Sequence, residues 1–78
     1  MDDTTGVKRD ILDFLRDNGF EAGDPLHEGP FYAEKMVHYD AQQKAAFKAA
    51  VEELVAEGLL EQHDDIIILT AKGQAALA

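Results

Sequence analysis

Side chains able to contact nucleic acid gather in one short segment of this sequence. Gln42, Gln43 and Lys44 follow one another directly, Lys48 comes about one helical turn after Lys44, and Lys35 lies shortly before them. Glutamine can hydrogen bond to adenine in the major groove, and lysine can bind guanine or phosphate. These residue types predict base and phosphate contacts. The alternative interpretation is the solvated face of an amphipathic helix.

Charge is distributed unevenly around that segment. Three lysines against one aspartate give positions 35 to 48 a local charge of +2, whereas the 78-residue chain has a net charge of −9 from seven Lys and Arg against sixteen Asp and Glu. An acidic surface repels nucleic acid at long range. Three interpretations of the acidity remain open: solubility, a basic protein partner, or mimicry of DNA. If the chain binds duplex DNA, the basic segment is where the DNA would bind.

Few residues could perform catalysis or hold a metal. The chain has no Ser and no Cys, so the commonest nucleophiles and thiolate metal sites are missing. The three histidines are far apart, and His63 beside Asp64 and Asp65 is better explained as a solvated turn than as a metal site. We therefore expect no enzyme activity, no metal and no cofactor.

The length predicts one domain over residues 1–78, with 1–4 disordered. A chain of this size buries roughly 60–65% of its unfolded surface, which is enough for a small core. No apolar run approaches the roughly 20 residues of a membrane span. The start, Met1-Asp2-Asp3, is acidic where a signal peptide is basic. We expect a cytoplasmic protein that does not contact a membrane.

The first predicted helix covers residues 5–18. Apolar residues recur at i, i+4, i+7 and i+8 from Val7, which is one stripe of a helix. Thr4 or Thr5 is the expected N-cap, and Gly19 can end the helix in a left-handed conformation.

A connection rich in Gly and Pro follows, over residues 19–30. It could contain a short strand, with Phe20 and Leu26 as anchors to the core. Because proline suits the first position of a helix, Gly29-Pro30 predicts a second helix over 31–38.

The third helix is predicted over residues 41–57. Asp40 is the expected N-cap, and Gln43 completes a capping-box pattern with it. Good helix formers fill the run that follows, and Gly58 ends it.

A β-hairpin should follow the third helix, with Asp64-Asp65 as a two-residue turn. This turn sets the pairs Leu60–Leu69, Glu61–Ile68, Gln62–Ile67 and His63–Ile66. Leu60, Ile67 and Leu69 then face the core, and Thr70 caps a short last helix that runs through Leu77.

The sequence AAFKAAVEELVAEGLLEQHDDIIILTAKGQAAL, residues 45–77, resembles a segment of many bacterial and archaeal winged-helix transcription regulators. In that segment a recognition helix runs into L..L...GL, a wing follows, and LT..G...L closes it. The corresponding residues here are Val51, Leu54, Gly58, Leu59, Leu69, Thr70, Gly73 and Leu77. The resemblance implies an α+β winged helix-turn-helix with a three-helix core, a two-stranded wing and a short C-terminal helix.

The resemblance also implies a transcription-regulator type of function, with the third helix in the major groove of duplex DNA. Gln42, Gln43 and Lys44 would then read bases, and Lys35 and Lys48 would bind phosphates. The wing tip carries two aspartates and would repel DNA, so the third helix would have to make the contact without it.

The alternative is an acidic winged helix that binds protein and not DNA. Ile66 and Ile68 lie on the outer face of the predicted hairpin, where they could contact a protein partner or a second copy in a homodimer. A strand from residues 19–30 could instead cover them.

Overall fold

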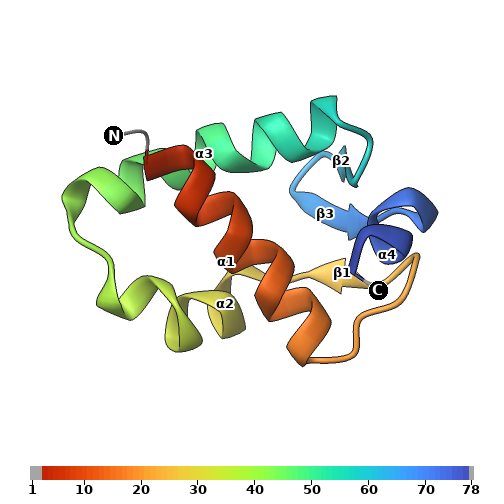
Figure 1. The fold of residues 1–78 in the computed structure, drawn as a ribbon, viewed down its shortest axis with the longest axis horizontal. Coiled ribbons are helices and arrows are strands. Elements are labelled where there is room, and N and C mark those ends of the chain that lie inside the picture. The colour runs from red at the N-terminus through yellow and green to blue at the C-terminus, as the bar shows by residue number, and fades with distance from the viewer. Residues whose placement is uncertain (1–2, 78) are drawn as a thin grey trace.

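The computed structural model describes residues 3–77, which form four α-helices, one short 3₁₀ helix and a three-stranded antiparallel sheet (Figure 1). In chain order the elements are α1 (Asp3–Asp17), β1 (Pro25–Leu26), α2 (Glu28–Glu34), the 3₁₀ helix η1 (Met36–His38), α3 (Ala41–Ala56), β2 (Leu60–His63), β3 (Ile66–Leu69) and α4 (Ala71–Leu77). The chain is thus a small α+β fold.

Helix α1 packs its apolar stripe into the core, as predicted. Val7, Ile11 and the following apolar residues of this stripe are buried. Its C-terminal end is also as predicted, because Gly19 has a φ of 69°. The N-terminal boundary was wrong, because Asp3, Thr4 and Thr5 already lie within the helix. Of the end predicted to be disordered, residues 1–2 lie outside the described part of the chain.

The connection between α1 and α2 contains the short strand that its composition allowed. Strand β1 pairs with β3, with Pro25 opposite Ile68 and Leu26 opposite Ile67. Leu26 is buried, and the Phe20 ring lies 5.9 Å from that of Phe14. This connection therefore supplies the edge strand that pairs with β3.

The predicted second helix, 31–38, was wrong in its boundaries. Helix α2 begins at Glu28 and stops at Glu34, and the chain then tightens into η1. Pro30 is its third helical residue and not its first. The first four N–H groups of a helix have no intrahelical acceptor, so proline fits at several first-turn positions.

Helix α3 begins with the predicted capping box. Asp40 Oδ1 accepts a hydrogen bond from the Gln43 backbone N–H at 2.9 Å, and Gln43 Oε1 accepts one from the Asp40 N–H at 3.0 Å. The helix ends at Ala56, and Gly58 takes a φ of 81° just beyond it. The prediction for α3 is confirmed to within one residue.

The hairpin has the predicted register in all four pairs, from Leu60–Leu69 to His63–Ile66. Asp64 has a φ of 56°, so the tight turn places a non-glycine residue in the left-handed region. Leu60 and Leu69 are buried, and Ile67 packs against the core. The sheet order β1-β3-β2 leaves β2 at one edge.

Phe31 of α2 stands at the centre of the core. It is fully buried and contacts three other rings, those of Phe14 at 5.3 Å, Phe47 at 5.4 Å and Tyr39 at 6.5 Å between centroids. These rings come from α1, α3 and the segment between η1 and α3. One side chain therefore joins the elements that position α3.

Helix α4 is joined to the rest of the fold through Thr70 and Gly73. The Thr70 hydroxyl accepts a hydrogen bond from the Gly73 N–H at 2.9 Å, which confirms it as the cap. The same hydroxyl lies 2.6 Å from the carbonyl oxygen of Gly58, to which it can donate. The end of α3, the end of β3 and the start of α4 thus share one hydrogen-bonded junction.

Candidate nucleic-acid interface

Helix α3 presents an outward face of lysines and small residues in its N-terminal half. Lys44 and Lys48 are exposed and lie one turn apart on the same side. Ala41, Ala45 and Ala49 are also exposed. Small exposed side chains beside the two cations allow this part of the helix to approach another surface closely.

The lysines of this region are free of intramolecular ion pairs within residues 3–77. No salt bridge there involves Lys35, Lys44 or Lys48. The ammonium of Lys44 lies 6.0 Å from the ring centroid of Tyr32, an aromatic side chain of α2 that is 44% exposed. These cations can therefore bind an external anion without breaking an existing ion pair.

The two predicted glutamines are placed differently from the lysines. Gln43 is half-buried and its side-chain oxygen is engaged in the capping box. Gln42 is exposed, but it lies about 200° around the helix axis from Lys44. Lys35 is half-buried at the C-cap of α2. Helix geometry thus brings Lys44 and Lys48 together and separates both glutamines from them.

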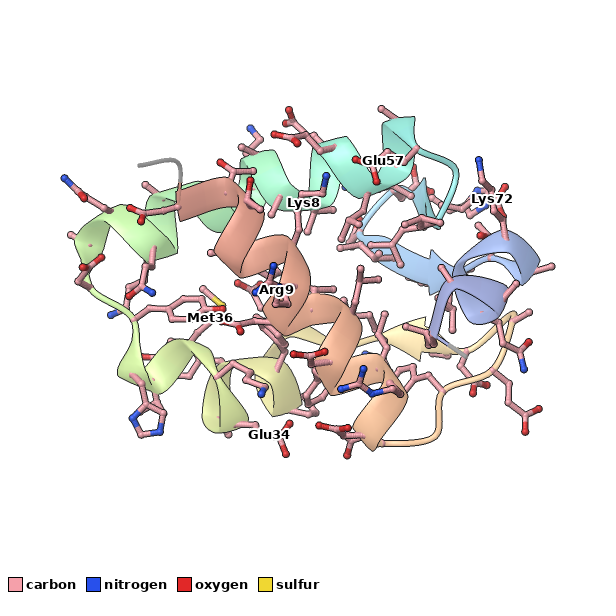
Figure 2. All side chains as sticks on the ribbon, viewed as in Figure 1. Lys8, Arg9, Glu34, Met36, Glu57 and Lys72 are labelled. Atoms are coloured by element: carbon pink, nitrogen blue, oxygen red, sulfur yellow. The ribbon has the colours of Figure 1, made fainter. Side chains whose placement is uncertain are left out.

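Glu52 and Glu53 lie near the end of α3, Glu57 is its C-cap residue, and two of these three glutamates pair with a lysine of α1. Lys8 of α1 lies 3.3 Å from a Glu53 oxygen and also pairs with Glu57 (Figure 2). The hydrogen bond to Glu57 raises the pKa of Lys8, against an opposing effect of burial, and Glu53 raises it further. Glu52 remains exposed beside Lys48. Lys8 therefore partly compensates the acidity at the end of α3, although the Glu53 and Glu57 side chains stay 51% and 47% exposed.

The hairpin tip is acidic and exposed, as predicted. Asp64 and Asp65 both face solvent, and His63 Nε2 lies 3.7 Å from Glu61 Oε1. Within residues 3–77, no cluster of three or more side chains is arranged to hold a metal ion.

Ile66 and Ile68 differ in exposure. Ile66 at the start of β3 is 51% exposed, whereas Ile68 is half-buried opposite Pro25 of β1. The strand from residues 19–30 therefore reaches Ile68 and leaves Ile66 open.

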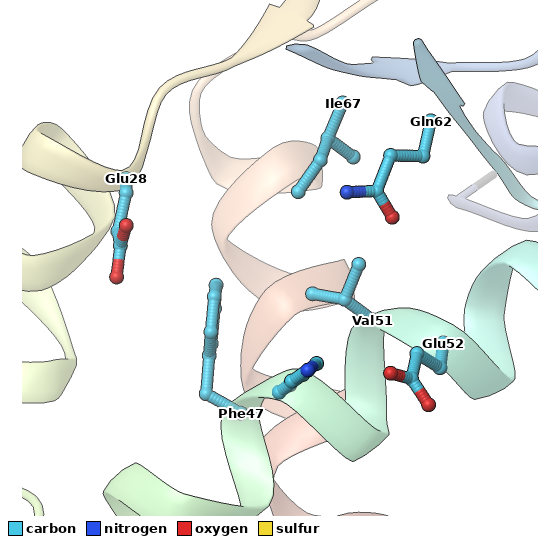
Figure 3. A pocket seen from close by; sticks show the side chains of 7 residues that line it. Glu28, Phe47, Val51, Glu52, Gln62 and Ile67 are labelled. Carbon is cyan, nitrogen blue, oxygen red and sulfur yellow. The ribbon is translucent and has the colours of Figure 1, made fainter. Parts of the chain in front are cut away.

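A groove lies beside the lysine face, between α3, the hairpin and the start of α2 (Figure 3). It has a volume of about 250 Å³. Its lining residues are Glu28, Phe47, Lys48, Val51, Glu52, Gln62 and Ile67. Sequence reasoning did not find this groove, although the register that pairs Gln62 with Ile67 and the core stripe of α3 contained part of the signal.

Tyr39 ties the chain before α3 to α1, and its titration provides a test of that contact. Its hydroxyl donates a hydrogen bond to Asp10 Oδ2 at 2.7 Å. Burial raises the pKa of Tyr39, and the hydrogen bond to Asp10 raises it further. A tyrosine whose pKa is raised by folding stabilises the protein fully below its unfolded pKa of about 10, and this stabilisation declines as the pH rises above that value.

We expect Tyr39→Phe to lower the free energy of unfolding by about 1 kcal/mol at pH 7 through loss of this hydrogen bond. The difference from wild type should shrink between about pH 10 and pH 11, because only the wild type loses stability by ionisation of residue 39 there. Urea denaturation of both proteins at pH 7 and at about pH 11 measures this difference in the free energy of unfolding. Lys8 is common to both proteins, so its titration cancels, and an equal difference at both pH values would contradict the role of Tyr39.

No family model, curated protein or solved structure matched this chain in the comparisons. None of the helices within residues 3–77 combines the length and the apolar character needed to cross a membrane.

Proposed function

We propose that the chain is a winged-helix module of transcription-regulator type that binds duplex DNA through α3. The order of helix, strand, helix, helix and hairpin, with the third strand between the other two, supports this assignment. So does the resemblance of residues 45–77 to winged-helix regulators. Under this proposal α3 enters the major groove, and the protein is a binding module and not an enzyme.

The observation that carries the proposal is the free pair of lysines on the outward face of α3. Lys44 and Lys48 have no ion-pair partner within residues 3–77, and exposed alanines lie beside them. The two lysines are close enough to contact successive phosphates or a guanine edge together. Lys35 would add a contact at the edge of this surface, and Gln43 would act through the capping box that orients the start of α3. Gln42 lies on another side of the helix and would not share a contact with the two lysines.

The acidic hairpin limits how the protein can be oriented on DNA under this proposal. Asp64 and Asp65 would be repelled by the phosphate backbone, so the hairpin is directed away from DNA. The small number of cations implies weak binding with a shallow dependence on salt.

A titration of fluorescently labelled duplex DNA across salt concentrations tests the proposal. We expect binding at low salt, with log Kobs falling linearly against log[salt]. Replacing both Lys44 and Lys48 by alanine should reduce the magnitude of this slope by about 1.8, since each phosphate contact contributes about 0.9. Fluorescence anisotropy measures the affinity at each salt concentration.

The matched control is the double variant Arg9→Ala/Lys72→Ala. It removes the same two positive charges from exposed positions on α1 and α4. This control should keep the wild-type slope within error. Equal losses in both double variants would assign the effect to net charge, and no binding by the folded wild type at low salt would reject DNA binding.

The second candidate function is protein contact by an acidic adaptor or by a homodimer. The observation that favours it is the exposed Ile66 beside the acidic tip of the hairpin. In the same titration this candidate predicts no DNA binding by a folded protein at any salt concentration.

A further inference from the structure

The groove beside α3 has the chemistry of a small binding site. Phe47 and Val51 rise from α3, and Ile67 comes down from the hairpin to meet them (Figure 3). Val51 is buried, and Phe47 and Ile67 are half-buried and pack against the core. These three side chains give the groove an apolar floor that belongs to the core and is therefore held in place.

Carboxylates stand on two sides of this floor. Glu28 comes from the start of α2 and Glu52 from α3, so the two belong to different walls of the groove (Figure 3). Within residues 3–77 neither of them forms a salt bridge. Lys48 is the single cationic side chain among the lining residues, and Gln62 adds a neutral amide. The rim therefore has an excess of negative charge.

We propose that this groove binds a small organic cation with an aromatic or branched aliphatic body. The apolar part would pack against Phe47, Val51 and Ile67, and the ammonium or guanidinium group would lie at the rim, attracted by the negative charge of Glu28 and Glu52. A volume of about 250 Å³ is just below the roughly 300–1,000 Å³ of drug-sized sites, so the ligand is small. This inference rests on the groove and does not depend on DNA binding.

A series of three probes of similar shape tests the charge of the ligand. Phenethylammonium carries a positive charge, 2-phenylethanol is neutral and phenylacetate is negative. Nuclear magnetic resonance titration of ¹⁵N- and methyl-labelled protein should show saturable shifts at Phe47, Val51 and Ile67 with phenethylammonium. We expect a Kd on the order of 1 mM for a ligand of this size.

The neutral alcohol should bind about two- to fivefold more weakly, and phenylacetate should show no saturable shift. No saturable shift with phenethylammonium up to about ten times the expected Kd would reject the site. Equal affinity for the amine and the alcohol would reject the role of the carboxylates.

Substitutions of the charged residues at the rim should change the affinity for phenethylammonium in opposite directions. Glu28→Gln and Glu52→Gln should each weaken phenethylammonium binding about two- to fivefold, as expected for partly solvated charge pairs. Lys48→Met should strengthen it by a similar factor, because it removes the like charge. Glu21→Gln makes the same charge change at an exposed position outside the groove and should leave the affinity unchanged.

The two proposals can fail independently. The amine titration contains no DNA, so a failure there leaves the DNA proposal standing, and a chain that binds no DNA can still bind the amine. Lys48→Met separates them further, since it should strengthen amine binding and weaken DNA binding. A loss of both activities in this variant would contradict the proposed groove electrostatics.

Discussion

Replacing Gly73 by alanine should destabilise the protein by about 3 kcal/mol, although it adds only one methyl group. Gly73 is buried in α4, and a Cβ atom there would overlap the carbonyl oxygen of Leu59 and come within 2.7 Å of Leu69 Cδ1. A backbone carbonyl cannot rotate away as a side chain can. Helix α4 would have to move off the hairpin, which would strain the hydrogen bonds of Thr70.

Gly6→Ala is the matched control for this substitution. Gly6 also lies within a helix, but nothing approaches its Cβ position within 4 Å. Alanine is the better helix former, so this variant should be stabilised by about 0.5–1 kcal/mol. Thermal unfolding should then show Gly73→Ala lowered by roughly 12–24 °C and Gly6→Ala raised by a few degrees. A melting temperature of Gly73→Ala within about 4 °C of wild type would contradict the close packing of α4.

The parts of the fold that were predicted from sequence depend on short-range signals. The capping box of α3 needs only Asp40 and Gln43 three residues apart, and the hairpin register follows from a two-residue turn at Asp64-Asp65. Each signal lies within a few residues of the structure that it specifies. The same is true of Thr70 as the cap of α4.

The predicted start of α2 was wrong because a proline near the start of a helix is compatible with more than one first residue. Proline at position 30 favours the first helical residue but also fits the second or third, since none of those N–H groups has an intrahelical acceptor. Tertiary packing determines where α2 begins. It buries Leu26 in β1 and Phe31 in the core, with only a short link between them.

The candidate site was only partly visible in the sequence for a related reason. The outward placement of Lys44 and Lys48 follows from helical periodicity alone. The pairing of Glu53 and Glu57 with Lys8 joins residues more than forty positions apart, so no local pattern along α3 could predict it. The groove likewise needs three elements to come together before it exists.

Phe31→Ala should have the largest effect of any single core substitution, with a loss of about 3–5 kcal/mol. The Phe31 side chain is fully buried and contacts the rings of Phe14, Tyr39 and Phe47. Truncation removes those aromatic contacts and leaves a cavity where α1, α2 and α3 meet. Because the core of a domain of about 80 residues or fewer rarely supplies more than about 3–5 kcal/mol of net stability, the variant should be partly or wholly unfolded at 37 °C.

Tyr32→Ala is the control for that loss, because it truncates the next residue of the same helix. Tyr32 is 44% exposed and contributes mainly its contact with Lys44. We expect a change within about 1 kcal/mol, measured beside Phe31→Ala by urea denaturation followed by circular dichroism. Similar losses in both variants would mean that the helical propensity of α2 limits stability. A loss confined to Phe31→Ala would show that the aromatic cluster holds α3, and with it the lysine face and the groove, in position.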